Sequence, residues 1–203
     1  MRDDPAAQRP PRLRPLAERD IAGLQRFFDA NPEYFFNVNG EPPRADEAEH
    51  EFHDTPPPGM AYREMLILGF FAVDDGGASA DRDGELVAIA TIVADFIAEH
   101  IWHIGLFIVA TALHGSGAAH AMYRRLEEWM VERGAHWIRL GVVVGNTRAE
   151  RFWERSGYLQ VRERGPLEMG RRMNMLRVMV KPLAGRTIAP YLALVARDRP
   201  GAP

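Results

Sequence analysis

The sequence predicts an α/β (α+β) protein built on a mixed, mostly antiparallel sheet of six to seven strands flanked by helices. Three strongly apolar runs follow one another on short connections between residues 64 and 109, which is typical of an antiparallel meander. A strand, a long amphipathic stretch and another strand then occupy residues 100–144, and such a unit makes its two strands parallel. A chain of 203 residues is long enough for one domain with a full core.

The first quarter of the chain is expected to be mainly helical. Residues 1–11 are rich in proline and arginine and are expected to be flexible, while residues 12–16 alternate in polarity like a short strand. Apolar side chains recur at helical spacing over residues 17–30 and predict a helix. Residues 31–43 carry turn residues at both ends and predict a loop with an unusually aromatic centre, and residues 44–54 predict a short acidic helix.

The middle of the chain supplies the first part of the sheet. Apolar runs rich in β-branched and aromatic residues predict strands at residues 64–73, 85–97 and 100–109. Residues 74–84 are polar and rich in Asp and Gly, so they predict the turn between the first two of these strands.

Two helices alternate with the remaining strands. The amphipathic pattern over residues 117–133 predicts a helix that is closed by a glycine, and residues 136–144 predict a strand. An Asn at the start and a Gly at the end predict a helix over residues 146–157. Residues 158–164 and 174–183 predict the strands that complete the sheet.

We therefore expect a single domain over residues 12–183. Residues 1–11 form a flexible segment before it, and residues 184–203 form a tail in which no clear element is predicted.

The composition excludes several kinds of site. The net charge of -3 gives no electrostatic reason to expect binding to nucleic acid or to an anionic membrane. Cysteine is absent, which excludes disulfides, thiolate nucleophiles and Cys-ligated metals and fits a reducing cytoplasm. The N-terminus lacks the apolar core of a signal peptide, and the longest apolar runs are too short to span a bilayer. A cytoplasmic location is therefore expected.

A glycine-rich segment precedes the helix predicted at 117–133. Its residues are His114, Gly115, Ser116, Gly117, Ala118 and Ala119. The start of a helix carries unpaired N–H groups and a partial positive charge, so glycines there let an anion approach the backbone. A tight turn with no ligand explains the two glycines equally well. The segment is not a P-loop, because no Gly-Lys-Ser/Thr follows, and His120 interrupts a dinucleotide-binding fingerprint.

Residues 109–158, VATALHGSGAAHAMYRRLEEWMVERGAHWIRLGVVVGNTRAERFWERSGY, resemble the coenzyme-A-binding half of the GCN5-related N-acetyltransferases (GNAT superfamily). The family loop reads Gln/Arg-x-x-Gly-x-Gly/Ala; Gly117 and Ala119 match it, while His114 replaces the usual first residue. The second family segment, a strand followed by Asn, an aromatic-rich helix and Gly-aromatic, appears as VVVGNTRAERFWERSGY. The order of the predicted elements extends the resemblance to roughly residues 12–182, and it implies that the two central parallel strands splay apart.

The resemblance implies binding of coenzyme A, with acetyl-CoA as co-substrate and no metal. Main-chain groups of one central strand would pair with the pantetheine arm as if it were an added strand, and the loop amides would hold the pyrophosphate. Asn146 would contact the pantetheine arm as well as capping its own helix. The residues implied in coenzyme binding are Phe107, Ile108, Val109, His114, Gly115, Ser116, Gly117, Ala118, Ala119, Asn146, Phe152 and Trp153.

The implied reaction is direct attack of an amine on the thioester, in a ternary complex. His103 stands where the histone-type branch of the family has a Glu, shares strand parity with Val109 and is the candidate base, with a structural role on the strand as the alternative; Glu99 is the next candidate. The N–H of Val109 is the candidate donor to the oxyanion. Trp153 occupies the position of the family's acidic Tyr. Another Tyr therefore substitutes, coenzyme A leaves as thiolate, or the protein is a non-catalytic acyl-CoA sensor.

The resemblance places the acceptor pocket near the first two helices. Tyr34, Phe35 and Phe36 are the candidate wall residues, and Glu33 or Glu47 could attract a cationic amine. Covering the core is an equal reading for Phe35 and Phe36. The acceptor is expected to be a small-molecule amine or a protein amine, although acyl transfer to another acceptor stays open. The family also leaves room for a homodimer.

Overall fold

The computed structural model describes residues 9–73 and 84–202. The flexible segment expected at 1–11 and the turn expected at 74–84 therefore lie almost entirely outside the described residues. The strands are β1 (Arg12–Pro15), β2 (Glu64–Phe71), β3 (Leu86–Ala94), β4 (Ile101–Val109), β5 (Trp137–Val143), β6 (Leu159–Met169) and β7 (Arg172–Pro182). The α-helices are α1 (Ile21–Ala30), α2 (Glu33–Val38), α3 (Glu47–His53), α4 (Ala118–Glu132), α5 (Thr147–Arg155) and α6 (Ile188–Leu194). Short 3-10 turns are η1 (Glu18–Asp20), η2 (Thr111–Leu113) and η3 (Ala196–Asp198).

The described strands form one sheet of seven in the order β1-β2-β3-β4-β5-β7-β6. Every neighbouring pair is antiparallel except β4 and β5, which are parallel because α4 connects them. The prediction of a mixed, mostly antiparallel sheet flanked by helices is confirmed.

The two parallel strands separate along their length. Their pairing runs from Ile101 opposite Trp137 to Ile104 opposite Leu140 and then stops. Beyond that point β4 continues to Val109, still paired with β3, while the rest of β5 stays paired with β7. The sheet therefore opens into a wedge at its centre, as expected.

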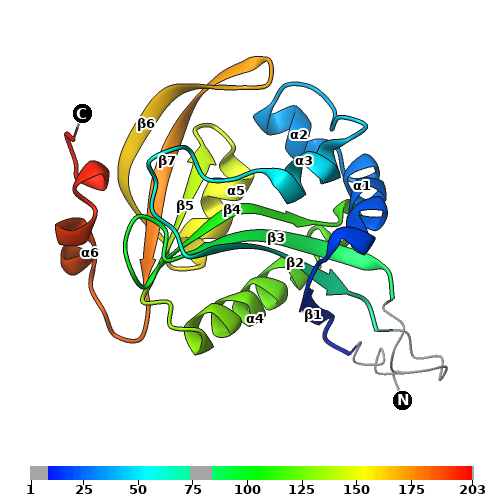
Figure 1. The fold of residues 1–203 in the computed structure, drawn as a ribbon, viewed down its shortest axis with the longest axis horizontal. Coiled ribbons are helices and arrows are strands. Elements are labelled where there is room, and N and C mark those ends of the chain that lie inside the picture. Colours follow the sequence, from blue (N-terminus) through cyan, green and yellow to red (C-terminus); the bar gives the residue numbers. More distant parts are fainter. Residues whose placement is uncertain (1–8, 74–83, 203) are drawn as a thin grey trace.

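Side chains that alternate along each strand bury the sheet on both faces. On β4, Ile108 packs with Phe28 of α1 and Phe35 of α2. The neighbouring Phe107 points to the opposite face and packs against the cluster that contains Leu126 of α4. Figure 1 shows α4 on one side of the sheet and α1, α2 and α3 gathered on the other. The wedge is thus held between two helical layers.

The segment expected to be a loop at 31–43 contains a helix, α2, so that expectation was wrong. Phe35 and Val38 are buried and stand three residues apart, which places them on one face of a single helical turn. A helix of six residues is too short to show a period in the sequence.

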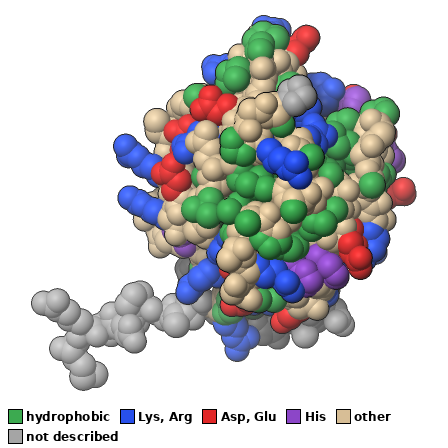
Figure 2. Space-filling view, turned by 90° about the vertical axis from the view of Figure 1, so that its left-hand side faces the viewer, with side chains coloured by type: hydrophobic (Ala, Val, Ile, Leu, Met, Phe, Trp, Pro, Cys, Tyr) green, Lys and Arg blue, Asp and Glu red, His purple; other side chains and the backbone are tan. Residues whose placement is uncertain are grey.

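The C-terminal residues 184–203 were expected to carry no regular element, and this was also wrong. Helix α6 packs against the outer part of the sheet through Tyr191, which contacts the cluster of Trp137 and Val180. Figure 2 looks onto this side of the molecule and shows apolar side chains gathered near the middle of the face, with Arg and Lys side chains among them. In the described chain no helix has the length and apolar character that crossing a membrane requires.

Candidate functional site

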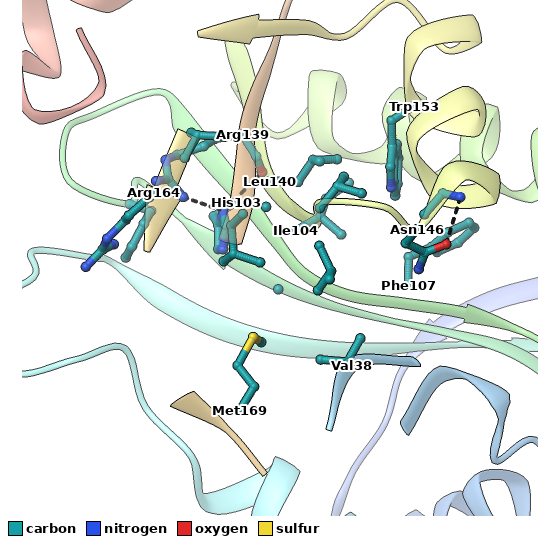
Figure 3. A pocket seen from close by; sticks show the side chains of 18 of the residues that line it. Val38, His103, Ile104, Phe107, Arg139, Leu140, Asn146, Trp153, Arg164 and Met169 are labelled. Atoms are coloured by element: carbon teal, nitrogen blue, oxygen red, sulfur yellow. Dashed lines mark hydrogen bonds between the residues drawn. The ribbon is translucent and has the colours of Figure 1, made fainter. Parts of the chain in front are cut away.

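A cavity of about 330 Å³ lies where β4 and β5 part. Figure 3 shows Phe107, Asn146 and Trp153 at one end of it and His103, Arg139 and Arg164 at the other, with Ile104 and Leu140 between them. Residues from α2, β4, β5, α5 and the β6–β7 hairpin all reach it. One continuous cavity therefore joins the wedge to a pocket near α2.

The edge of β4 that faces the wedge carries free main-chain groups. The N–H of Ala110 bonds the oxygen of Val87 at 2.8 Å, and hydrogen bonding alternates along an antiparallel ladder. The groups of Ile108 therefore face β3, whereas those of Phe107 and Val109 face the wedge. An extended ligand could bond to this edge as an added strand.

One main-chain group on this edge, the carbonyl oxygen of Val109, already has a hydrogen-bond partner within the protein. The His114 ring donates from Nε2 to the carbonyl oxygen of Val109 at 2.9 Å, which fixes the proton on that nitrogen. Within the described chain, the N–H of Val109 and both main-chain groups of Phe107 have no protein partner. A donor for a carbonyl or an oxyanion therefore remains at Val109.

The glycine segment opens α4 in an exposed concave turn. Gly115 and Gly117 have φ values of 81° and 86°, in the left-handed region that glycine adopts without strain. A Cβ built at either position would meet nothing within 4 Å, so the space beside the backbone is empty. Within the described chain, the N–H groups of Gly115, Gly117 and Ala119 have no hydrogen-bond partner. This arrangement suits an anion at the start of a helix of 15 residues.

Aromatic side chains form the wall between the wedge and the glycine segment. Phe152 stacks between His120, with ring centroids 4.5 Å apart, and Phe107, at 6.0 Å. Trp153 is buried and packs against Phe107 and Tyr158. Of these residues Phe107 and Trp153 line the cavity, so they give its inner end an apolar surface.

Asn146 lies where β5 gives way to α5. Its Oδ1 accepts a hydrogen bond from the N–H of Ala149 at 3.2 Å, which confirms the predicted N-cap. Because Asn146 also lines the cavity, its side-chain N–H groups stay available to a ligand there. Capping and ligand contact are therefore compatible.

His103 lies in the cavity wall on β4, stacked on Phe96. Its Nδ1 is 3.1 Å from the carbonyl oxygen of Arg139 and 3.4 Å from Nη1 of the same residue. The carbonyl is nearer and can only accept, so Nδ1 carries the proton and Nε2 is an acceptor. Burial, reinforced by the positive charge of Arg139, lowers the pKa of His103 to about 3. The ring is therefore neutral over the physiological range.

Lowering the pH should destabilise the protein through His103. Its pKa is lowered in the folded state, so between pH 6.5 and about 3 the unfolded chain takes up a proton that the folded protein does not. From pH 7 to pH 5 we expect this group to cost about 2 kcal/mol of unfolding free energy. Urea denaturation at both pH values should show a drop in the wild type that is smaller by this amount in His103→Gln. Equal drops in the two proteins would contradict the assignment.

The structure separates the other candidate residues. Tyr34 lines the cavity, whereas Phe35 is buried in the core and Phe36 is 47% exposed on the outside. Glu99 lies in the turn before β4 with its side chain 81% exposed and 3.5 Å from His100, and it is not part of the cavity wall. Of the expected catalytic and acceptor side chains, the structure therefore brings His103 and Tyr34 together.

Three arginines at the pocket end were not predicted from the sequence. Arg139, Arg164 and Arg197 line the cavity and come from β5, β6 and the turn η3. The one available signal was Arg139, a charged residue inside the apolar run HWIRLGVVV. Arg164 and Arg197 reach the cavity through tertiary packing that no local pattern shows.

The family model described as Acetyltransferase (GNAT) family matches residues 24–158, which is more than half of the chain. The chain therefore belongs to the GNAT acetyltransferase family.

Solved structures of the same fold agree with this. An acetyltransferase from Thermus thermophilus is 19% identical with a TM-score of 0.64, over 85% of this chain and 96% of that one. Spermidine N-acetyltransferase from Vibrio cholerae, in complex with CoA and spermine, is 16% identical with a TM-score of 0.62, over 85% and 95%. The ribosomal-protein-S18-alanine N-acetyltransferase from Escherichia coli is 13% identical with a TM-score of 0.57, over 88% and 97%. No curated protein sequence matches the chain closely enough to count as a relative.

Proposed function

We propose that the protein is an acyl-CoA-dependent N-acyltransferase that transfers acetyl from acetyl-CoA to a primary amine by direct attack. The observation that carries this proposal is the free edge of β4 in the wedge, which leads to the unpartnered N–H groups at the start of α4. The N–H groups at the helix start suit an anionic head, and the strand edge suits an extended amide chain, so a ligand with both parts would fit the site. The comparison with a CoA-bound relative of the same fold supports this reading.

The residues present suit coenzyme A. The N–H groups of Gly115, Gly117 and Ala119 would hold its diphosphate without any charged side chain. The main-chain groups of Phe107 would bond the pantetheine arm, with Asn146 on the opposite side. When bound, the coenzyme supplies a thioester carbonyl that an amine can attack, and the N–H of Val109 would stabilise the oxyanion that forms.

The amine must lose a proton, because an alkyl ammonium has a pKa of about 10. The cavity favours that loss, since the arginines at its pocket end disfavour a second positive charge. We assign His103 the task of accepting a hydrogen bond from the neutral amine at Nε2. With a pKa of about 3 it would position the nitrogen and not store the proton, and the exposed Glu99 is too poorly placed to do either. The proton of the amine would therefore pass to bulk water.

The leaving thiolate needs a donor, and Tyr34 is the one tyrosine in the cavity wall of the described chain. Burial, together with the charges of Glu51 and Glu47, raises its pKa, so the hydroxyl would donate a hydrogen bond to the thiolate and keep its own proton, and the thiolate would be protonated by water after release. Trp153 favours a second function, a non-catalytic acyl-CoA sensor, because an indole in the position of the family's Tyr cannot act as an acid.

Two measurements decide between these functions. Coenzyme A or acetyl-CoA at a hundredfold excess over Kd should add about 2.7 kcal/mol of stability, seen as a rise in Tm. Free thiol should then appear when amines are added to the protein with acetyl-CoA. A rise in Tm without thiol release from any amine would support the sensor, and no response to the coenzyme at millimolar concentration would refute both functions.

A further inference from the structure

Two of the three arginines at the pocket end of the cavity have no carboxylate partner. Arg164 is half-buried on β6, and its side chain makes no hydrogen bond or ion pair with any residue that the structure describes. Arg197 is also half-buried, and the one hydrogen bond that its guanidinium makes within the described chain is to the Met60 sulfur at 2.9 Å. Both guanidinium groups therefore keep donors that are free for a ligand.

The third arginine is already neutralised. Arg139 donates from Nε and Nη2 to the two carboxylate oxygens of Asp198, at 2.7 and 3.2 Å. Figure 3 shows Arg139 beside Arg164 and His103 at the same end of the cavity. The charge left without compensation is therefore that of Arg164 and Arg197.

No carboxylate offsets this charge from the cavity wall. Among the residues of the described chain that line the cavity, there is no Asp or Glu. The two carboxylates expected to attract a cationic amine lie elsewhere: Glu33 is 3.8 Å from both His114 and Arg148, and Glu47 is bonded to Arg44. The pKa of Arg197 is lowered by burial and by the charge of Arg164, as expected of two close like charges.

We propose that the acceptor is a primary amine that carries an oxyanion, bound by the guanidinium groups of Arg164 and Arg197. This inference rests on the proposed function and narrows its substrate class. A guanidinium presents a planar fork of donors that matches a carboxylate or a phosphonate. A polyamine would instead bring further positive charge beside arginines that have no carboxylate partner in the described chain, which is unfavourable.

The rest of the wall limits the size and polarity of the acceptor. The cavity wall also contains the apolar side chains of Val38, Met60, Phe96 and Met169. A short apolar substituent fits this surface, and about 330 Å³ is near the lower limit for a small-molecule site. An apolar α-amino acid combines the amine, the oxyanion and the apolar group in that space.

The inference is tested by thiol release from acetyl-CoA with matched acceptors: L-leucine, L-leucinamide, isopentylamine, an aminophosphonate of the same shape, and spermidine. We expect kcat/KM for L-leucine to exceed that for the amide and the plain amine by at least about tenfold. Activity with the aminophosphonate as well would assign the site to oxyanions in general. Equal or higher activity with spermidine or isopentylamine would overturn the inference.

Variants test whether Arg164 causes the preference for an acceptor with a carboxylate. Arg164→Gln should lower kcat/KM for L-leucine by about tenfold to a hundredfold, mainly through KM, and should lower it for L-leucinamide by a much smaller factor, so the preference for L-leucine shrinks. Arg164→Lys should keep part of the preference. Arg171→Gln is the matched control, because that side chain is 79% exposed and pairs with Glu41 outside the cavity. Loss of activity with both acceptors in Arg164→Gln at unchanged Tm would contradict the assignment.

A binding measurement separates this inference from the proposed function. N-acetyl-L-leucine should bind the wild type in calorimetry and bind Arg164→Gln at least about tenfold more weakly. If no acceptor releases thiol but this difference is present, the oxyanion site stands and the catalytic proposal fails. If thiol is released and the two proteins bind N-acetyl-L-leucine alike, the catalytic proposal stands and the oxyanion site fails.

Discussion

Gly117→Asp should weaken binding of coenzyme A by at least about a hundredfold, whereas Gly117→Asn should weaken it by less than about tenfold. Position 117 has φ of 86°, and Asn and Asp are the side chains that adopt this conformation most readily after glycine. Both variants add almost the same volume to the empty space beside the loop. They differ in one negative charge, which would lie a few ångströms from the diphosphate and repel it by several kcal/mol.

The measurement is calorimetric titration of coenzyme A into the wild type and the two variants at one low salt concentration. The Tm of each free protein serves as the control, since the substitution should leave the fold intact. Raising the ionic strength should narrow the gap between the variants, because an exposed charge is screened. Equal affinities in Gly117→Asp and Gly117→Asn would show that no phosphate lies at this loop.

The coenzyme end of the site could be predicted because its determinants are local in the sequence. The glycines at 115 and 117 set the backbone, and the helix that follows supplies the unpaired N–H groups. The strand–helix–strand order of 100–144 fixed the parallel pair of β4 and β5. These features depend on neighbours in the chain and not on distant packing.

The acceptor end depends on contacts between distant segments, and the sequence showed little of it. Tyr34 and Phe36 are two residues apart on α2, yet one lines the cavity and the other is exposed on the outside. Arg164 is the last residue of the strand predicted at 158–164, and β6 continues beyond it to Met169. The register with β7 shifts between Arg164 and Leu167, so Gly165 and Pro166 are accommodated there. Local spacing cannot distinguish such positions from solvated ones.

The C-terminal segment missed from the sequence also positions the site. Asp198 is 1% exposed, follows α6 and holds the Arg139 guanidinium; Tyr191 donates its hydroxyl to the same carboxylate. Burial opposes ionisation of Asp198, but the bonds from Arg139 and Tyr191 outweigh it and leave its pKa lowered. Arg139 in turn lies against His103 in the cavity wall. The tail therefore fixes one side of the pocket.

Asp198→Ala should reduce the free energy of unfolding by about 3–5 kcal/mol, because it leaves the Arg139 guanidinium buried without a counter-charge. Urea denaturation at neutral pH measures the loss. Glu64→Ala is the control: its pair with Arg63 is exposed, and such pairs contribute less than about 1 kcal/mol.

The double variant Arg139→Met, Asp198→Leu distinguishes the charge from the packing. Replacing both members of a buried pair by apolar side chains is often neutral, so the double variant should be more stable than Asp198→Ala alone. If Asp198→Ala costs less than about 1 kcal/mol, the ion pair does not hold the C-terminal segment on the sheet, and packing of Tyr191 must do so alone.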